Sequence, residues 1–120
     1  MTEIRKAKDI TRKEYHCCHG GVGTLSCDSL LDGLDSTQFA FMHSDTIPAG
    51  VSIGVHEHVR NEEIYYLLSG KGLLTYDGKE FEMNPGDISI CLIGHTHSFA
   101  ATEDSRLIVV GGPATGGTSK

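Results

Sequence analysis

Short runs of apolar residues, broken by glycine, proline and polar residues, make up most of the chain after residue 38. The segments "FAFMHSDTI", "VSIGVHEH" and "EEIYYLLSG" are rich in β-branched, aromatic and aliphatic residues or alternate between apolar and polar positions, as β-strands do. No segment has a sustained helical period. The pattern therefore predicts a chain built of many short strands.

Glycine and proline turns separate the later strands. In "GLLTYDGKEFEM" two predicted strands meet at Asp77-Gly78, a dipeptide that favours the type I′ turn of a β-hairpin. The turn "NPGD" is followed by three more predicted strands, "ISICLIG", "HSFAATE" and "SRLIVVGG". Many short strands at short spacing predict an all-β sandwich or a closed barrel.

Length and charge exclude several classes of protein. A chain of 120 residues is long enough for one domain with a modest core. Its formal net charge of −6 argues against a surface that binds nucleic-acid phosphates. No apolar run approaches the roughly 20 residues that span a bilayer, and the charged start "MTEIRKAKDITRKEY" has no signal-peptide core. We expect a cytoplasmic protein that binds neither membrane nor nucleic acid.

Four cysteines would lie in a reducing compartment, where disulfides are uncommon: Cys17, Cys18, Cys27 and Cys91. Cys17 and Cys18 lie within "HCCHGG", between His16 and His19, so zinc binding is one interpretation of this segment. The spacing of structural zinc sites is absent, and packing of small residues is the favoured interpretation. The sequence leaves the roles of Cys17, Cys18 and His19 open, and Cys91 is expected in a buried strand.

Two histidines, His56 and His58, are separated by one residue in a predicted strand. Residues i and i+2 of a strand project from the same face, so both imidazoles would reach one space. Glu63 begins the next predicted strand after a four-residue connection, which can return its carboxylate beside the imidazoles. His97 follows a strand beyond the "PGD" turn, and a barrel would place that strand beside the first pair. Imidazole and carboxylate ligands suit iron, manganese, nickel, copper or zinc.

These residues carry a resemblance to the cupin superfamily, in particular to its small single-domain members of the cupin 2 type. The first cupin motif is a glycine, five residues, His-x-His, a short gap, a glutamate, six residues and a glycine, and it matches Gly50, His56, His58, Glu63 and Gly70. The second motif is matched more loosely, by Gly78, Pro85, Gly86, Asp87 and His97. Where the family commonly has prolines before its last ligand this chain has "LIG", and Ala101 stands where an asparagine is common.

The resemblance covers roughly residues 36–112 and implies a double-stranded β-helix, a jelly-roll barrel with one divalent metal ion in its mouth. It implies Mn, Fe, Ni, Zn or Cu as the ion and, as its ligands, His56, His58, Glu63 and His97. The alternative is a cupin that keeps the barrel without a metal and lines an organic pocket with its histidines. On this interpretation residues 1–35 form an N-terminal arm and edge strands, 36–112 the barrel core and 113–120 a disordered tail.

Two positions beside the motifs leave an alternative open. Glu62 precedes Glu63, and only one of the two can face inward because neighbouring strand side chains alternate. The spacing to Gly70 favours Glu63. His95 forms a second His-x-His with His97, and it is a candidate either for that ligand position or for a nearby acid–base group.

Because such a metal acts as a Lewis acid or an electron relay, the resemblance implies a mononuclear metalloenzyme, namely a dioxygenase, isomerase or lyase of a small organic molecule. The alternative is a non-enzymatic module that binds or senses a small ligand, and a purely structural barrel is a weaker third. Candidate catalytic residues are His43, His95 and Tyr65. Tyr65 is two residues after Glu63 in the same predicted strand, so its side chain projects from the same face. The candidate substrate-binding residue is Arg60, in the loop after the His-x-His pair.

The few cationic side chains indicate the charge of the substrate, and the apolar strands indicate whether the chain pairs with a second copy. The chain offers about one cation near the expected site, so we expect a non-phosphorylated substrate that is neutral or carboxylated. Strands such as "ISICLI" and "LIVV" are apolar on both faces, which predicts a homodimer.

Overall fold

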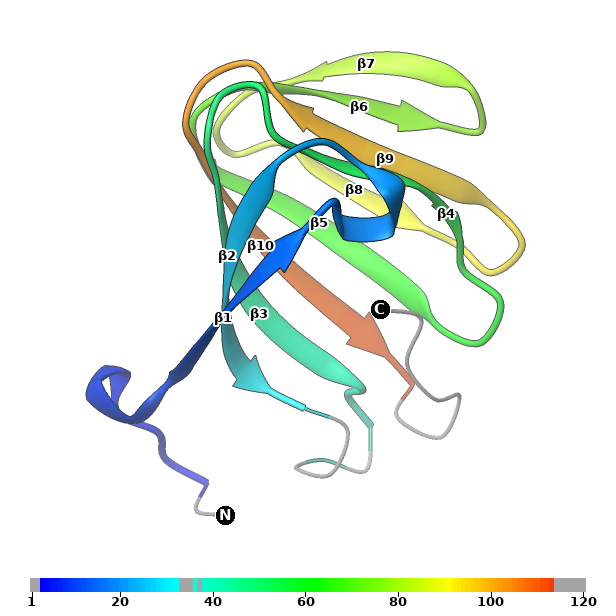
Figure 1. The fold of residues 1–120 in the computed structure, drawn as a ribbon. Helices are drawn as coiled ribbons and strands as arrows, with labels where there is room; N and C mark the ends of the chain where they lie inside the picture. The colour runs from blue at the N-terminus through cyan, green and yellow to red at the C-terminus, as the bar shows by residue number, and fades with distance from the viewer. Residues whose placement is uncertain (1–2, 33–35, 37, 114–120) are drawn as a thin grey trace.

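The computed structural model describes residues 3–32, 36 and 38–113. Within them the chain forms two antiparallel sheets that lie on either side of the core and curve into an open barrel (Figure 1). The fold is therefore the all-β jelly roll, a double-stranded β-helix, that the sequence predicted.

Six strands form the larger sheet, in the order β1-β2-β3-β10-β5-β8. They are β1 (Thr11–His16), β2 (Thr24–Leu31), β3 (Phe41–Ile47), β10 (Ser105–Gly112), β5 (Glu62–Ser69) and β8 (Ile88–Cys91). The smaller sheet has the order β4-β9-β6-β7, with β4 (Ser52–Glu57), β9 (Thr96–Ala101), β6 (Gly72–Tyr76) and β7 (Lys79–Met83). Two short 3-10 helices, η1 (Ala7–Asp9) and η2 (Cys18–Gly20), precede and follow β1.

Alternating side chains fill the space between the sheets. Strand β10 crosses the larger sheet, and every second residue in it is buried. Leu107 and Val109 of β10 belong to one core cluster with Ile53 of β4 and Phe99 of β9, and all four are at most 1% exposed. Burying a side chain of this size contributes about 1.5–3 kcal/mol, so these positions hold the two sheets together.

The hairpin of β6 and β7 has the turn that the sequence predicted. Tyr76 pairs with Lys79, which leaves Asp77 and Gly78 as a two-residue loop. Both loop residues have positive φ, 49° for Asp77 and 81° for Gly78, as a type I′ turn requires. This turn sets the register of the hairpin.

The amino-terminal part of the chain joins the barrel. Strands β1 and β2 pair with each other and β2 pairs with β3, so they extend the larger sheet. The start of the barrel core at residue 36 stays a prediction. Except for Pro113, the predicted tail over residues 113–120 lies outside the described residues. The strand predicted over residues 51–58 ends one residue earlier, at Glu57.

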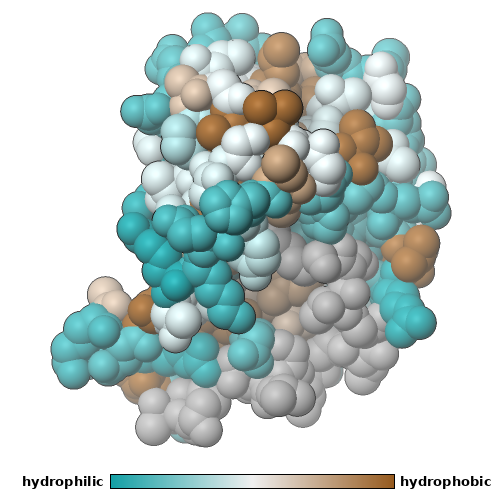
Figure 2. Space-filling model, in the orientation of Figure 1, coloured by the Kyte–Doolittle hydropathy of each residue, from teal (hydrophilic) through white to brown (hydrophobic). Residues whose placement is uncertain are grey.

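Polar side chains cover much of the face shown in Figure 2, and most of its apolar residues gather in the upper half. Exposed large apolar side chains include Tyr66, Leu68, Ile88 and Ile90 on β5 and β8. In the described ranges, no helix has the length and apolar character that a membrane span needs.

Candidate metal centre

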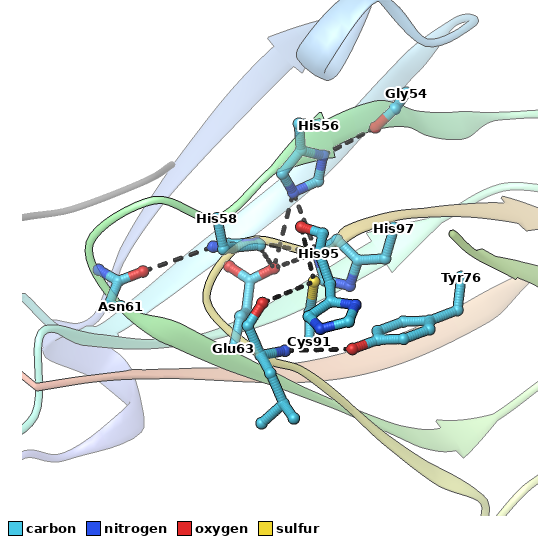
Figure 3. A network of polar contacts seen from close by, with 10 residues as sticks. Gly54, His56, His58, Asn61, Glu63, Tyr76, Cys91, His95 and His97 are labelled. Atoms are coloured by element: carbon cyan, nitrogen blue, oxygen red, sulfur yellow. Dashed lines mark hydrogen bonds and ion pairs between the residues drawn. The ribbon is translucent and has the colours of Figure 1, made fainter. Parts of the chain in front are cut away.

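His56 and His97 lie side by side in the smaller sheet. His56 is on β4, His97 is on β9, and the two residues are Cα partners in the antiparallel ladder. Directly paired residues project from the same face, so both imidazoles enter the same space (Figure 3). Their Nε2 atoms are 3.1 Å apart, although the residues are 41 positions apart in sequence. The pairing of β4 with β9 therefore sets this contact.

His58 follows the last residue of β4 and is held by backbone hydrogen bonds to the turn before β9. Its N–H donates to the carbonyl oxygen of His95 at 3.2 Å, and its own carbonyl accepts from the Gly94 N–H at 2.8 Å. The side chain is fully buried, and its Nε2 lies 2.9 Å from that of His97. His58 thus enters the space beside His56 from a loop rather than from a strand.

Glu63 brings a carboxylate from the opposite sheet. On β5, Glu62 faces solvent while Glu63 is 2% exposed, so Glu63 is the inward-facing residue of the two, as the spacing to Gly70 predicted. The Glu63 Oε1 atom is 3.0 Å from His97 Nε2, 3.2 Å from His58 Nε2 and 3.8 Å from His56 Nε2. Side chains from both sheets therefore converge on one point (Figure 3).

The group of four side chains that can hold a metal ion is named here the three-histidine centre; it consists of His56, His58, Glu63 and His97. Two ligands bound about 2.1 Å from an ion and at right angles to each other are about 3.0 Å apart. The separations of 2.9–3.2 Å match such adjacent positions, and the one of 3.8 Å is wider. Three imidazoles and one carboxylate suit a first-row divalent ion, so the residues fit the metal that the sequence implied.

Hydrogen bonds on the far side of two imidazoles leave their Nε2 atoms available as ligands. His56 Nδ1 lies 2.8 Å from the carbonyl oxygen of Gly54, so this nitrogen carries the proton and donates it. His58 Nδ1 is 3.4 Å from Oδ1 of Asn61, which is itself fully buried. Burial lowers the pKa of His97, which favours the neutral, metal-binding form of its imidazole.

Tyr65 packs against the centre. Its ring stacks on His97 with centroids 4.3 Å apart, and the residue is 1% exposed. Burial first, and then the charges of Glu63 and Asp45, raise the pKa of the Tyr65 hydroxyl well above its ordinary value. The phenol therefore stays protonated at neutral pH, and its ring holds His97 in place. The catalytic role that the sequence suggested for Tyr65 stays a prediction.

His19 lies at the edge of the centre, a position that sequence reasoning missed. It belongs to η2, has a positive φ of 52°, and its ring stacks on His56 with centroids 3.8 Å apart. The approach requires a glycine on β4, because a Cβ on Gly54 would lie 2.2 Å from the His19 carbonyl oxygen. A glycine inside a predicted strand often marks such a close approach of backbone, and Gly54 was the one available signal.

His95 contacts groups outside the centre. Its side chain is 43% exposed and forms an ion pair with Asp77, and its ring stacks on Tyr76. The backbone N–H of Thr96 first, and then His95, lower the pKa of Asp77. Of the second His-x-His pair, His97 rather than His95 therefore belongs to the group that can hold the ion.

The remaining candidates from the sequence also lie elsewhere. Arg60 is exposed in the loop between β4 and β5. His43 is buried on β3, where its Nδ1 lies 2.8 Å from Oδ1 of Asp45. In the segment "HCCHGG", Cys17 is exposed and Cys18 is buried. The structure thus brings the four expected ligands together and leaves these residues outside the group.

A jelly-roll barrel with three imidazoles and one carboxylate at a common point defines the class of cupin barrels. The family model described as Cupin domain matches residues 43–111, which is more than half of the sequence. The chain belongs to the cupin family.

Two curated relatives are similar in sequence. The oxalate-binding protein of Thermotoga maritima is 29% identical over 106 residues, which cover 87% of this chain and 87% of the relative. An uncharacterized protein of Methanocaldococcus jannaschii is 46% identical over 41 residues, which cover 34% of this chain and 33% of the relative.

Solved structures show the same fold. A predicted oxalate decarboxylase of Thermotoga maritima superposes with a TM-score of 0.83 and 26% identity, covering 90% of this chain and 96% of that chain. An RmlC-like cupin of Shewanella frigidimarina superposes with a TM-score of 0.74 and 16% identity, covering 94% and 92% of the two chains. The second likeness is one of fold alone.

Proposed function

We propose that this protein is a metal-binding cupin whose three-histidine centre binds a small carboxylate, with oxalate as the first candidate. The observation that carries the proposal is the charge of the ligand set. Glu63 is the one anionic member of the centre, so a divalent ion held there keeps one net positive charge. Such an ion attracts an anionic oxygen ligand, and the oxalate-binding relative supports this choice of ligand.

The route to the centre favours a compact ligand. The side chain of His56 is 10% exposed, whereas those of His58, Glu63 and His97 are at most 2% exposed. A ligand therefore approaches past His56, beside the stacked ring of His19. Four protein ligands leave two positions of an octahedral ion, which is the number that one small dicarboxylate occupies.

The residues around the ligands hold them in position. When bound, the metal ion supplies a Lewis acid or a redox centre. The Gly54 carbonyl and the Asn61 side chain orient two of the imidazoles, and the Tyr65 ring fixes His97. Arg60, exposed in the adjacent loop, remains a candidate for the rim of the ligand site.

Catalysis is the second candidate function: a mononuclear dioxygenase, isomerase or lyase acting on a non-phosphorylated molecule. Tyr65 is the candidate catalytic residue that contacts the centre, and its raised pKa makes it a proton donor rather than a base at neutral pH. His43 and His95 contact Asp45 and Asp77 instead. This distribution favours binding over turnover.

Isothermal titration calorimetry of the full chain loaded with Mn²⁺ tests the binding proposal. Oxalate is expected to bind the loaded protein saturably, and binding should disappear when the metal is removed or when His58 is replaced by alanine. Succinate is the matched control anion, because its two carboxylates are too far apart to form the same compact chelate. Equal binding of oxalate to metal-free protein, or none at millimolar concentration, would overturn the proposal.

Turnover separates the two candidate functions. The loaded protein is incubated with excess oxalate while oxalate loss and oxygen uptake are followed. Consumption of many equivalents per chain supports an enzyme, and binding without loss supports a ligand-binding module.

We also propose that the protein is a homodimer that pairs through the outer face of β5 and β8. Four large apolar side chains on this face are exposed to solvent: Tyr66 (37%), Leu68 (51%), Ile88 (65%) and Ile90 (46%). A stable interface buries about 800 Å² on each partner, and adjacent apolar strands offer a surface suited to it. Light scattering is expected to give a dimer that Ile90→Lys dissociates. A wild-type monomer at micromolar concentration would contradict the proposal.

A cytoplasmic location also belongs to the proposal. It is supported by the four cysteines, none of which forms a disulfide. The net charge of −6 supports the absence of a nucleic-acid partner.

A further inference from the structure

We propose a second metal site, separate from the three-histidine centre, formed by Cys27, His43 and Asp45. Each residue offers one ligand atom, and these atoms lie within 4.8 Å of one another. The three residues are 4%, 5% and 0% exposed, respectively. This group is named the Cys27 site, and its ion is zinc or another thiophilic divalent cation.

Strand pairing brings the three side chains together. Cys27 of β2 is the Cα partner of Asp45 on β3, and the two strands run side by side in Figure 1. Paired residues share a face of the sheet. His43 lies two residues before Asp45, so its side chain projects from that same face. All three side chains therefore point into the barrel next to one another.

The Cys27 site is distant from the first centre. Glu63 and Phe41 are both paired with Gly111 and so lie at the same level of the larger sheet. Along β3, His43 lies two residues and Asp45 four residues beyond that level, which is roughly 7 and 13 Å. Strand β10 also lies between β3 and β5, which adds two strand spacings of about 4.8 Å each. One ion cannot be shared between the two groups over such a distance.

The ligand types of the Cys27 site favour a thiophilic ion. A thiolate, an imidazole and a carboxylate are the S, N and O ligands that zinc binds, whereas the three-histidine centre contains no sulfur. Such atoms are roughly 3.5 Å apart around a tetrahedral ion, so side-chain movements of about 1 Å close the set. The Nε2 atom of His43 is buried and has no hydrogen-bond partner among the described residues. His43 therefore keeps one ring nitrogen that its contact with Asp45 does not use.

The charges of the Cys27 site suit a buried divalent ion. One thiolate and one carboxylate neutralise two positive charges, so the loaded site has no net charge in the apolar interior. Its ladder neighbours on β10 are apolar, because Leu107 pairs with Asp45 and Val109 with His43. On the other side of the site the ladder partners are polar, because Ser29 pairs with His43 and Lys13 with Cys27. A purely structural hydrogen bond between His43 Nδ1 and Asp45 Oδ1, which are 2.8 Å apart, is the alternative explanation for that pair.

An ion in the Cys27 site would connect two parts of the chain. Cys27 lies outside the region that matches the cupin family, residues 43–111, whereas His43 and Asp45 lie inside it. The ion would therefore attach strand β2 to the cupin core and raise the free energy of unfolding by mass action.

Cobalt(II) titration of the metal-free full chain tests the Cys27 site, because a thiolate bound to Co²⁺ gives a near-ultraviolet charge-transfer band that imidazole and carboxylate ligands do not give. Wild-type protein is expected to bind about two cobalt ions per chain and to develop this band, which Zn²⁺ then abolishes by displacement. Cys27→Ser should remove the band and one ion, with the fold checked by circular dichroism. Cys17→Ser, which alters an exposed cysteine outside both groups, should leave both unchanged.

His58→Ala separates the two metal sites. This variant is expected to lose the ion of the three-histidine centre and to keep the thiolate band, which would support a separate Cys27 site whether or not oxalate binds. Loss of the band in His58→Ala would overturn the proposal. So would a wild-type chain that takes up one ion without the band, a result that does not depend on the folding of any variant. Survival of the full band in Cys27→Ser would also overturn it.

Discussion

Replacing Glu63 by glutamine removes one negative charge from the three-histidine centre and keeps the shape of the side chain. The Oε1 atom of Glu63 lies 3.0 Å from His97 Nε2 and 3.2 Å from His58 Nε2, so the carboxylate is a direct member of the group. An amide oxygen is neutral and binds a divalent ion more weakly. Glu62→Gln is the matched control, since it removes the same charge from the exposed side of the same strand.

The expected losses of metal affinity and of metal-dependent stabilisation in Glu63→Gln can be estimated in two steps. Substituting a residue that only orients a metal ligand costs roughly 10–100-fold in metal affinity, and removal of a charged ligand should reach at least the upper end of this range. A 100-fold weaker affinity removes about 2.7 kcal/mol of metal-dependent stabilisation when the metal exceeds both dissociation constants. For a chain of 120 residues, the rise in Tm caused by the metal should then be smaller by about 10 °C.

The assay is thermal unfolding of each variant with and without Mn²⁺, followed by circular dichroism. Mn²⁺ is chosen because it prefers oxygen and nitrogen ligands and so reports on the three-histidine centre rather than on a thiolate. Comparing the metal-induced shift within each variant cancels any effect of the substitution on the metal-free protein. The reasoning is refuted if Glu63→Gln keeps the wild-type shift, or if Glu62→Gln loses as much of it.

Gly54→Ala should lower the free energy of unfolding by about 1–3 kcal/mol in urea titrations, because its Cβ would lie 2.2 Å from the His19 carbonyl oxygen; wild-type stability would contradict this close approach. The pKa of Asp28 is lowered chiefly by a hydrogen bond from the guanidinium of Arg12, its partner on β1. Asp28 therefore stabilises the fold above its ordinary pKa of 3.8, and this contribution is lost as the pH falls through the lowered value. In thermal unfolding, Asp28→Asn should cost about 0.5 kcal/mol at neutral pH and progressively less in acid, so a constant cost would count against the pair. Burial raises the pKa of Cys91 to about 12, whereas Cys17 is exposed. Iodoacetamide at neutral pH should therefore alkylate Cys17 first, and peptide mass spectrometry showing the reverse order would disprove the burial of Cys91.

Local patterns were sufficient to predict much of the barrel. Strand alternation depends on neighbouring residues, so it indicated that only one of Glu62 and Glu63 faces inward. The spacing to Gly70 then selected Glu63, which is buried whereas Glu62 is exposed. The turn at Asp77-Gly78 also depends only on local backbone preference, and both residues have the predicted positive φ. The motif spacing selected the four side chains that the structure brings together.

What sequence alone determined about this protein is the succession of strands along the chain, the hairpin turn and, through the resemblance to the two cupin motifs, the four side chains that converge. The strands and the turn follow from short-range alternation and turn preference, and the four side chains from the spacing within the motifs. Only the tertiary structure decided that His19 stacks on His56 and that Cys27 faces His43 and Asp45. Those contacts join segments that are distant along the chain. Their proximity depends on which strands pair and in which register, and no local preference encodes that choice.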